Sequence, residues 1–155
     1  MAQVIPPALR LATPADAGAI RDIVRAAYAR WVPVIGREPL PMRVDYAEAL
    51  GKHRFDLLQR GARILALIET TPREDHLWIE NIAVPPDLQG QGLGRRLLAH
   101  AEDLARAAGL AELRLLTNAA FASNVALYER HGYVVTERAP FTGGVTVFMR
   151  KPLNP

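Results

Sequence analysis

The stretch formed by residues 77–98, LWIENIAVPPDLQGQGLGRRLL, constrains the fold more than any other part of the chain. Its first residues are apolar and β-branched, which predicts a buried strand. Pro85 and Pro86 end that strand because proline has no N–H group for a ladder. The glycine-rich residues 89–94 follow, and an amphipathic helix then begins. A strand, a glycine turn and a helix N-terminus predict an anion site, because unpaired backbone N–H groups and the helix dipole meet there.

The spacing of the glycines excludes two common phosphate-binding loops. A dinucleotide-binding fingerprint would need a glycine at Arg95 if it began at Gly90, or glycine or alanine at Leu97 if it began at Gly92. A Walker A loop needs Gly-Lys-Ser/Thr, which does not occur. Arginines at 95 and 96 are unfavourable for the first turn of the helix itself, which indicates an anionic partner.

Composition indicates one soluble domain, residues 1–155, with an ordinary hydrophobic core. Half of the residues are hydrophobic and 23% are charged, and no apolar run approaches the ~20 residues that span a bilayer. The N-terminal MAQVIPPALR lacks a basic start and an apolar core, so we expect no signal peptide and a cytoplasmic protein. The net charge of +3 gives little support for nucleic acid as a partner. The absence of cysteine excludes disulfides, a catalytic thiol and cysteine metal ligands.

Hydrophobic periodicity predicts alternating strands and helices in the order β-α-α-β-β-β-α-β-α-β-β. The predicted strands are 8–12, 53–59, 63–69, 77–84, 112–117, 133–137 and 145–150, and the predicted helices are 16–29, 46–51, 93–108 and 124–131. Residues 31–45 are predicted to form a long loop, 70–75 a polar turn and 138–144 a hairpin loop. This order implies an α/β sheet with both parallel and antiparallel strand pairs.

Two motifs resemble those of the GCN5-related N-acetyltransferases, the GNAT family. Gln89, Gly92 and Gly94 match the pattern Gln/Arg-x-x-Gly-x-Gly/Ala, and NVALYERHGY, which begins at Asn124, is similar to the segment that ends in Gly-Tyr/Phe. The resemblance extends over residues 9–151 and implies a GNAT-like sheet of about seven strands flanked by about four helices. In that fold the fourth and fifth strands are parallel and splay apart to admit acetyl-coenzyme A (acetyl-CoA). Family habit also implies a homodimer.

The resemblance implies that acetyl-CoA is a co-substrate and that its arm pairs with the backbone of the central strand. The family's glycine loop holds the pyrophosphate, and its asparagine binds the cofactor arm. The residues expected to contact the cofactor are Ile82, Ala83, Val84, Gln89, Gly90, Gln91, Gly92, Leu93, Gly94, Arg95, Asn124 and Tyr128.

Acetyl transfer to an amine requires a neutral amine, donors for the oxyanion and a proton for the departing thiolate. The resemblance brings the Tyr128 hydroxyl near the sulfur and makes it the expected acid; a half-buried core aromatic is the alternative. Glu80 is a carboxylate within an apolar strand, where a charge is costly to bury unless it is paired, and is the expected base through water. An ion pair or a substrate-orienting role is the alternative for it. Strict alternation would place Glu80 with Ile82 and Val84, and Asn81 on the opposite face.

Aromatic residues flank the predicted loop that in the family covers the acceptor site. Tyr28, Trp31 and Tyr46, with Asp45 to attract a cation, are therefore expected to bind a small-molecule or peptide amine. A hydrophobic lid packed on the sheet is the alternative. No histidine pair has metal-ligand spacing, so no metal is expected. The sequence thus favours an acetyl-CoA-dependent N-acetyltransferase, with a non-catalytic acyl-CoA-binding or regulatory module on the same fold as the alternative.

Overall fold

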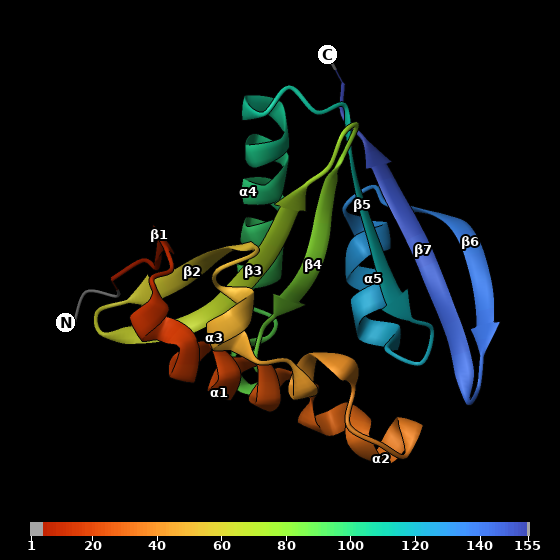
Figure 1. The fold of residues 1–155 in the computed structure, drawn as a ribbon, viewed down its shortest axis with the longest axis horizontal. Helices are drawn as coiled ribbons and strands as arrows, with labels where there is room; N and C mark the ends of the chain where they lie inside the picture. Colours follow the sequence, from red (N-terminus) through yellow and green to blue (C-terminus); the bar gives the residue numbers. More distant parts are fainter. Residues whose placement is uncertain (1–4, 155) are drawn as a thin grey trace.

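A mixed seven-stranded sheet in the order β1-β2-β3-β4-β5-β7-β6 forms the centre of the computed structural model, which describes residues 5–154 (Figure 1). The strands are β1 (Ala8–Leu11), β2 (Arg54–Arg60), β3 (Arg63–Pro72), β4 (Leu77–Ala83), β5 (Glu112–Asn118), β6 (Val134–Phe141) and β7 (Gly144–Pro152). Strands β4 and β5 are parallel, and all other neighbours are antiparallel. The predicted mixed α/β sheet with parallel fourth and fifth strands is confirmed.

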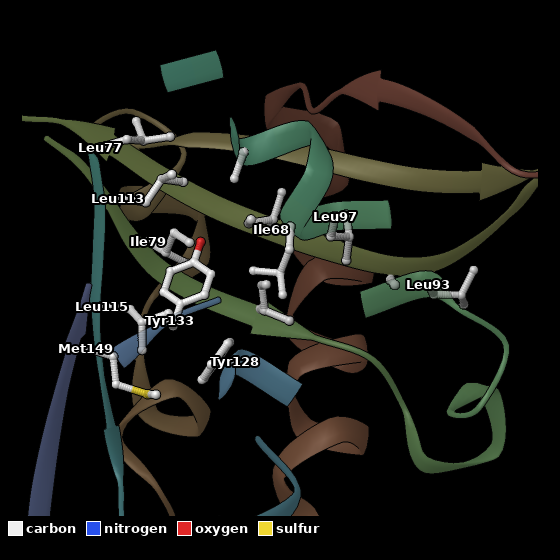
Figure 2. Close-up of a cluster of buried hydrophobic side chains, with 14 of the residues drawn as sticks. Ile68, Leu77, Ile79, Leu93, Leu97, Leu113, Leu115, Tyr128, Tyr133 and Met149 are labelled. Atoms are coloured by element: carbon white, nitrogen blue, oxygen red, sulfur yellow. The ribbon is translucent and has the colours of Figure 1, made fainter. Parts of the chain in front are cut away.

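Helices cover both faces of the sheet. They are α1 (Ala17–Tyr28), α2 (Val32–Ile35), α3 (Tyr46–Ala49), α4 (Leu93–Ala107) and α5 (Ala122–Arg130), with 3₁₀ turns η1 (Pro14–Asp16), η2 (Ala29–Trp31), η3 (Leu40–Arg43) and η4 (Pro86–Leu88). Helices α1 and α3 pack on one face in a cluster that includes Ile20, Tyr46 and Phe55. Helices α4 and α5 contribute to the other cluster, which Figure 2 shows with Ile79, Leu97 and other labelled side chains. The four predicted helices are all present.

Three segment boundaries differ from the predicted ones. The predicted loop 31–45 contains α2 and η3; proline is tolerated in the first turn of α2, and Gly36 ends that helix at φ 76°. The predicted turn at 70–75 is wrong in its first half, because Thr70 and Thr71 continue β3 and pair with β4. The predicted loop 138–144 is also too long: β6 and β7 pair as far as Phe141 and Gly144, so only residues 142–143 form the turn.

One irregularity positions the site. Glu69 pairs with Asn81 and Thr70 pairs with Ile79, so Glu80 is an extra residue in β4 and forms a β-bulge. The parallel ladder between β4 and β5 ends at the same place, since its only residue pairs join Leu77–Ile79 to residues 113–115. Beyond Ile79 the two strands separate, as Figure 1 shows. The bulge and the opening of the sheet therefore coincide.

Residues 1–4 and 155 lie outside the described part of the chain. The prediction of no signal peptide concerns a segment that begins on those residues. The predicted domain 1–155 also begins and ends on them. Within residues 5–154, no helix has the length and apolar character needed to cross a bilayer.

An ion pair joins β1 to the start of α1. Arg10 donates two hydrogen bonds of 2.9 Å to the two carboxylate oxygens of Asp16, which also accepts a 2.8 Å bond from the backbone N–H of Thr13. The hydrogen bonds from Arg10 are the main reason that the pKa of Asp16 is lowered to about 2. A carboxyl group with a lowered pKa stabilises the fold above its unfolded pKa of about 3.9, and that stabilisation is lost as the pH falls through the folded value.

We therefore expect Asp16→Asn to lower the free energy of unfolding by about 1 kcal/mol at pH 7. Urea unfolding at a series of pH values measures this, and the difference from the wild type should shrink between about pH 4 and pH 2. Asp22→Asn, at an exposed position of the same helix, is the matched control. A difference for Asp16→Asn that stayed constant over this range would contradict the role given to the ion pair.

Candidate active site

Two cavities meet at Tyr28, whose ring lines both of them. The first has a volume of about 320 Å³ and lies among the end of α1, the glycine-rich turn, the start of α4 and α5. The second has a volume of about 550 Å³ and is lined by the α2–α3 segment, β4, β5 and the β6–β7 hairpin. The opening between β4 and β5 thus has a cavity on each side of one shared aromatic residue.

The glycine-rich turn shapes the first cavity. Gly92 is the N-cap of α4 with φ 79°, a left-handed conformation that residues with a Cβ atom rarely adopt. Gly94 allows α5 to approach, since a Cβ atom there would lie 3.1 Å from a methyl carbon of Leu127. The N-terminus of α4 thus borders the cavity at two positions without a side chain, an arrangement that suits a phosphate group.

Basic side chains surround this cavity. Arg30, Arg95, Arg130 and His131 all line it. Of these, sequence reasoning identified only Arg95. Arg130 and His131 end α5 one turn or less after Tyr128, but nothing in the local pattern shows that this helix end meets α4. The lining therefore supplies positive charge where an anionic cofactor would lie.

Arg30 connects three elements at the rim of the first cavity. Its guanidinium donates to Gln89 Oε1 at 3.2 Å in the glycine-rich turn and to Ser123 Oγ at 2.8 Å in α5. It also lies 4.5 Å above the centre of the Trp31 ring. Gln89 in turn donates to the backbone oxygen of Val84 at 3.1 Å. The expected cofactor residue Gln89 is thus already part of a polar bridge across the opening.

Most of the residues expected to bind the cofactor line the first cavity: Ile82, Val84, Gln89, Gly90, Gly92, Leu93, Gly94, Arg95 and Asn124. Three others do not line it. Ala83 is fully buried against α1 and α3, Gln91 is exposed in the turn, and Tyr128 is buried in the cluster shown in Figure 2. The structure therefore brings together the loop, the end of β4 and the start of α5.

Tyr128 lies between α5 and the sheet, with its ring centre 5.9 Å from that of Tyr133. Burial raises the pKa of Tyr128 well above that of a free tyrosine, so its hydroxyl stays protonated at neutral pH. A raised pKa also makes the hydroxyl a weaker acid, so transfer of its proton requires an acceptor whose charged form is penalised by the same surroundings.

The bulge changes the predicted faces of β4. Glu80 and Asn81 both line the second cavity, whereas Ile79 and Ile82 pack together in the cluster against α4. Two predictions are therefore wrong. Glu80 does not share a face with Ile82 and Val84, and Asn81 is not on the face opposite to Glu80. Alternation fails here because the extra residue shifts the register.

Glu80 is paired on three sides. One of its carboxylate oxygens accepts a 3.1 Å hydrogen bond from Thr71 Oγ1 and lies 3.7 Å from Arg73 and 3.9 Å from His53 Nε2. The other ring nitrogen of His53, Nδ1, lies 2.6 Å from Glu69 Oε2. Burial is the main cause of a raised pKa at Glu69. Two carboxylates therefore bracket one imidazole at the wall of the second cavity.

Sequence reasoning missed His53 and Glu69. Glu69 follows five apolar residues in its strand, which is the same signal that singled out Glu80. No local pattern indicates His53, because it meets Glu69 only through the antiparallel pairing of β2 with β3.

The residues expected to bind the acceptor are only partly brought together. Tyr28 and Tyr46 line the second cavity. The Tyr28 hydroxyl donates to Asn81 Oδ1 at 2.6 Å, and the Tyr46 hydroxyl donates to the backbone oxygen of Pro41 at 2.6 Å. Tyr46 thereby holds η3 over the cavity.

Trp31 and Asp45 do not line either cavity. Trp31 stacks on Phe121 with ring centres 5.0 Å apart, so it supports the wall from behind. Asp45 is the N-cap of α3 and accepts a 3.2 Å hydrogen bond from the backbone N–H of Glu48. A capping role explains why the carboxylate faces the helix.

Within residues 5–154, no group of three or more His, Asp or Glu side chains is arranged to hold a metal ion.

Solved structures of acetyltransferases share this architecture. The crystal structure of the ribosomal-protein-S18-alanine N-acetyltransferase from Escherichia coli has a TM-score of 0.77 and 28% identity, covering 96% of this chain and 95% of that one. An N-acetyltransferase from Thermoplasma acidophilum in complex with coenzyme A has a TM-score of 0.83 and 17% identity, covering 95% and 99%. The second likeness shows the fold alone.

Curated relatives match about half of the chain. The IAA acetyltransferase of Azospirillum brasilense is 40% identical over 79 residues, which are 48% of this chain and 50% of that protein. The [ribosomal protein bS18]-alanine N-acetyltransferase of Escherichia coli K12 is 43% identical over 79 residues, 51% and 53%. The chain thus spans about half the length of the curated relatives that it matches.

The match to a whole family extends further along the sequence than the match to either curated relative. The family model for the Acetyltransferase (GNAT) family matches residues 20–133, from α1 through the glycine-rich turn and α5 to Tyr133. With the splayed parallel strands and the turn described above, this match establishes that the chain belongs to the GNAT family of acetyltransferases.

Proposed function

We propose that this protein transfers the acetyl group of acetyl-CoA to a primary amine by direct attack within a ternary complex. The observation that carries the proposal is the pair of cavities that share Tyr28 at the opening of the sheet. One cavity is basic and bordered by a helix N-terminus, and the other has two carboxylates in its wall. A thioester that enters from the first side can therefore meet an amine that enters from the second.

In this proposal the glycine-rich turn binds the pyrophosphate of acetyl-CoA through the N–H groups at the start of α4. The arm of the cofactor follows the backbone of β4 at residues 82–84, where β5 has separated and offers no ladder partner. Backbone N–H groups at the same place polarise the thioester carbonyl. Asn124 borders the arm from the side of α5.

The chemical step uses Glu80 in the wall of the second cavity and Tyr128, which lies buried in α5 behind the first cavity. Glu80 removes a proton from the bound ammonium group through water, and the neutral amine attacks the thioester carbonyl carbon. A C–N bond forms, the C–S bond breaks, and Tyr128 gives its proton to the departing sulfur. The second proton of the attacking nitrogen then replaces the one that Tyr128 gave. The products are an amide, coenzyme A and one released proton.

The acceptor is a primary amine that combines a cation with an apolar part. Tyr28 and Tyr46 line its cavity. Leu40 and Leu116 line it too, and they are 73% and 50% exposed to solvent. Trp31 supports this wall through Phe121, and we propose that it affects the acceptor indirectly. An alanine-initiated peptide, spermidine and tyramine form a suitable panel, the first because one relative is named for the alanine of a ribosomal protein.

The panel also separates an enzyme from a non-catalytic acyl-CoA-binding module. Release of free thiol from acetyl-CoA in the presence of an amine supports the enzyme. Tight binding of acetyl-CoA with no thiol release from any amine would favour the binding module. A cytoplasmic location and a homodimer remain our proposals, and light scattering of the purified protein tests the dimer.

Gly92→Ala should weaken acetyl-CoA binding at least tenfold, because an L-residue at φ 79° costs about 1–2 kcal/mol and forces the turn to move. Isothermal calorimetry measures the change. Gly61→Ala is the matched control: Gly61 also has positive φ, 57°, but lies in the β2–β3 hairpin away from both cavities. If the wild type and a folded Gly92→Ala variant bound acetyl-CoA with equal affinity, the proposal that this turn binds the cofactor would be wrong.

Tyr128→Phe should lower kcat by about 10²–10⁴ while leaving acetyl-CoA affinity nearly unchanged, because only the proton donor is removed. Steady-state thiol release and calorimetry give the two quantities. Tyr133→Phe makes the same change in the neighbouring ring and should keep kcat. If both variants turned over like the wild type, the thiolate would receive its proton elsewhere.

Glu80→Gln should lower the rate most near neutral pH, where the amine is protonated. Much of the loss should vanish at high pH, where the free amine is abundant. The pH profile of kcat/KM for the acceptor measures this, with Glu137→Gln on exposed β6 as the control. A loss that is the same at every pH would indicate a structural or orienting carboxylate.

A further inference from the structure

His53 lies between two carboxylates at the wall of the acceptor cavity. We propose that His53, held in place by Glu69, receives the proton that Glu80 takes from the amine and releases it to solvent. The inference rests on the proposed acetyl transfer and adds a route by which the proton leaves.

The geometry fixes what each ring nitrogen can do. Nδ1 lies 2.6 Å from Glu69 Oε2, and a carboxylate at that distance accepts the N–H of the ring. In the neutral ring, Nε2 then carries the lone pair, and it faces Glu80 Oε1 at 3.9 Å. One water molecule or a small rotation of either side chain joins these two atoms. The imidazole can therefore take a proton from the side of Glu80.

The three side chains of this arrangement differ in their access to solvent. The side chain of Glu69 is 7% exposed and that of Glu80 is 23% exposed, whereas that of His53 is 29% exposed. Glu69 is thus a fixed orienting group inside the fold. His53 is the member from which a proton reaches bulk water most directly.

Charged and titratable groups from several elements face His53. Glu69 faces it from β3 and Glu80 from β4, with Tyr46 of α3 near Glu69 and Arg73 beside Glu80. Burial of Glu69 raises the pKa of that group, while the hydrogen bond to His53 opposes the rise. An imidazolium formed during proton transfer would lie between the carboxylates of Glu69 and Glu80.

The neighbouring charges on its own segment are engaged elsewhere. Lys52 pairs with Glu48 at 2.7 Å, and Arg54 pairs with Asp56 at 2.8 Å. Neither cation is directed to the His53 ring by these contacts.

A proton route answers a requirement of the reaction. Each turnover converts an ammonium group to an amide and releases one proton besides the one that ends on sulfur. Glu80 lies near Arg73 and accepts a hydrogen bond from Thr71. For a second turnover Glu80 must return its proton, and the neutral ring of the adjacent His53 offers a lone pair at Nε2. Glu80 is then ready for the next amine.

His53→Asn tests the route because the asparagine amide can still donate to Glu69, although it has no titrating group. We expect kcat/KM for the acceptor to fall by about 10²-fold at pH 7, with the loss shrinking at higher pH. Added imidazole should restore part of the activity. His76→Asn is the matched control, since His76 forms the same kind of pair with Asp75, at 2.7 Å, outside the acceptor cavity. The most active amine of the three-member panel serves as the probe.

Two results would overturn the inference: a pH-independent loss in His53→Asn without rescue by imidazole, or unchanged activity. A second measurement does not depend on turnover. Long-range ¹H–¹⁵N NMR of the protein with coenzyme A should show neutral His53 protonated on Nδ1, and Glu69→Leu, which removes the acceptor, should abolish that preference. A proton on Nε2 in the neutral wild-type ring would refute the route even if acetyl transfer is confirmed. Absence of transfer to every amine, with the Nδ1 form intact, would instead count against the proposed function and with it the relay.

Discussion

Three residue pairs hold β4 to β5, and everything that makes the molecule a candidate enzyme depends on how early that ladder stops. Both strands continue well beyond the last pair, so their backbone groups face an opening where a sheet would normally be closed. The bulge at Glu80 lies at the same level and turns β4 locally. It brings Glu80 and Asn81 to one wall while Ile79 and Ile82 remain in the core.

The two sides of the opening differ in charge. Arginines from η2, α4 and α5 surround the side of the glycine-rich turn, whereas the other side has Glu69 and Glu80 together with Arg37 and His53. The formal net charge of +3 conceals this uneven distribution. In the reaction that we propose, the two carboxylates would attract a cationic amine on the side away from the polyanionic cofactor.

Local patterns in the sequence predict the fold and the loop well, because the relevant interactions are close in sequence. Strand, glycine turn and helix are consecutive, and Gly92 adopts the left-handed conformation that such a turn requires. The sequence shows Glu80 as a carboxylate in an apolar strand. The face predicted for its side chain is wrong, because strict alternation along a strand cannot detect an extra residue. The partner of Glu80 could not be found in this way, since His53 reaches it through the pairing of β2 with β3. Trp31 shows the same limit, because its stacking on Phe121 depends on a distant part of the chain. Asp45 differs: its capping bond to Glu48, three residues on, is a local contact that an N-cap pattern could have indicated.

Tyr28 forms part of both cavities and is fixed by the hydroxyl bond to Asn81 and by edge-on packing against Phe121. In the ternary complex that we propose, both ligands would therefore contact the same residue. An adjustment of Tyr28 caused by one ligand would change the wall that the other ligand meets. Thermodynamic linkage makes any such coupling reciprocal, so each ligand would alter the affinity for the other by the same factor. Tyr28 would then be the residue through which the two sites communicate.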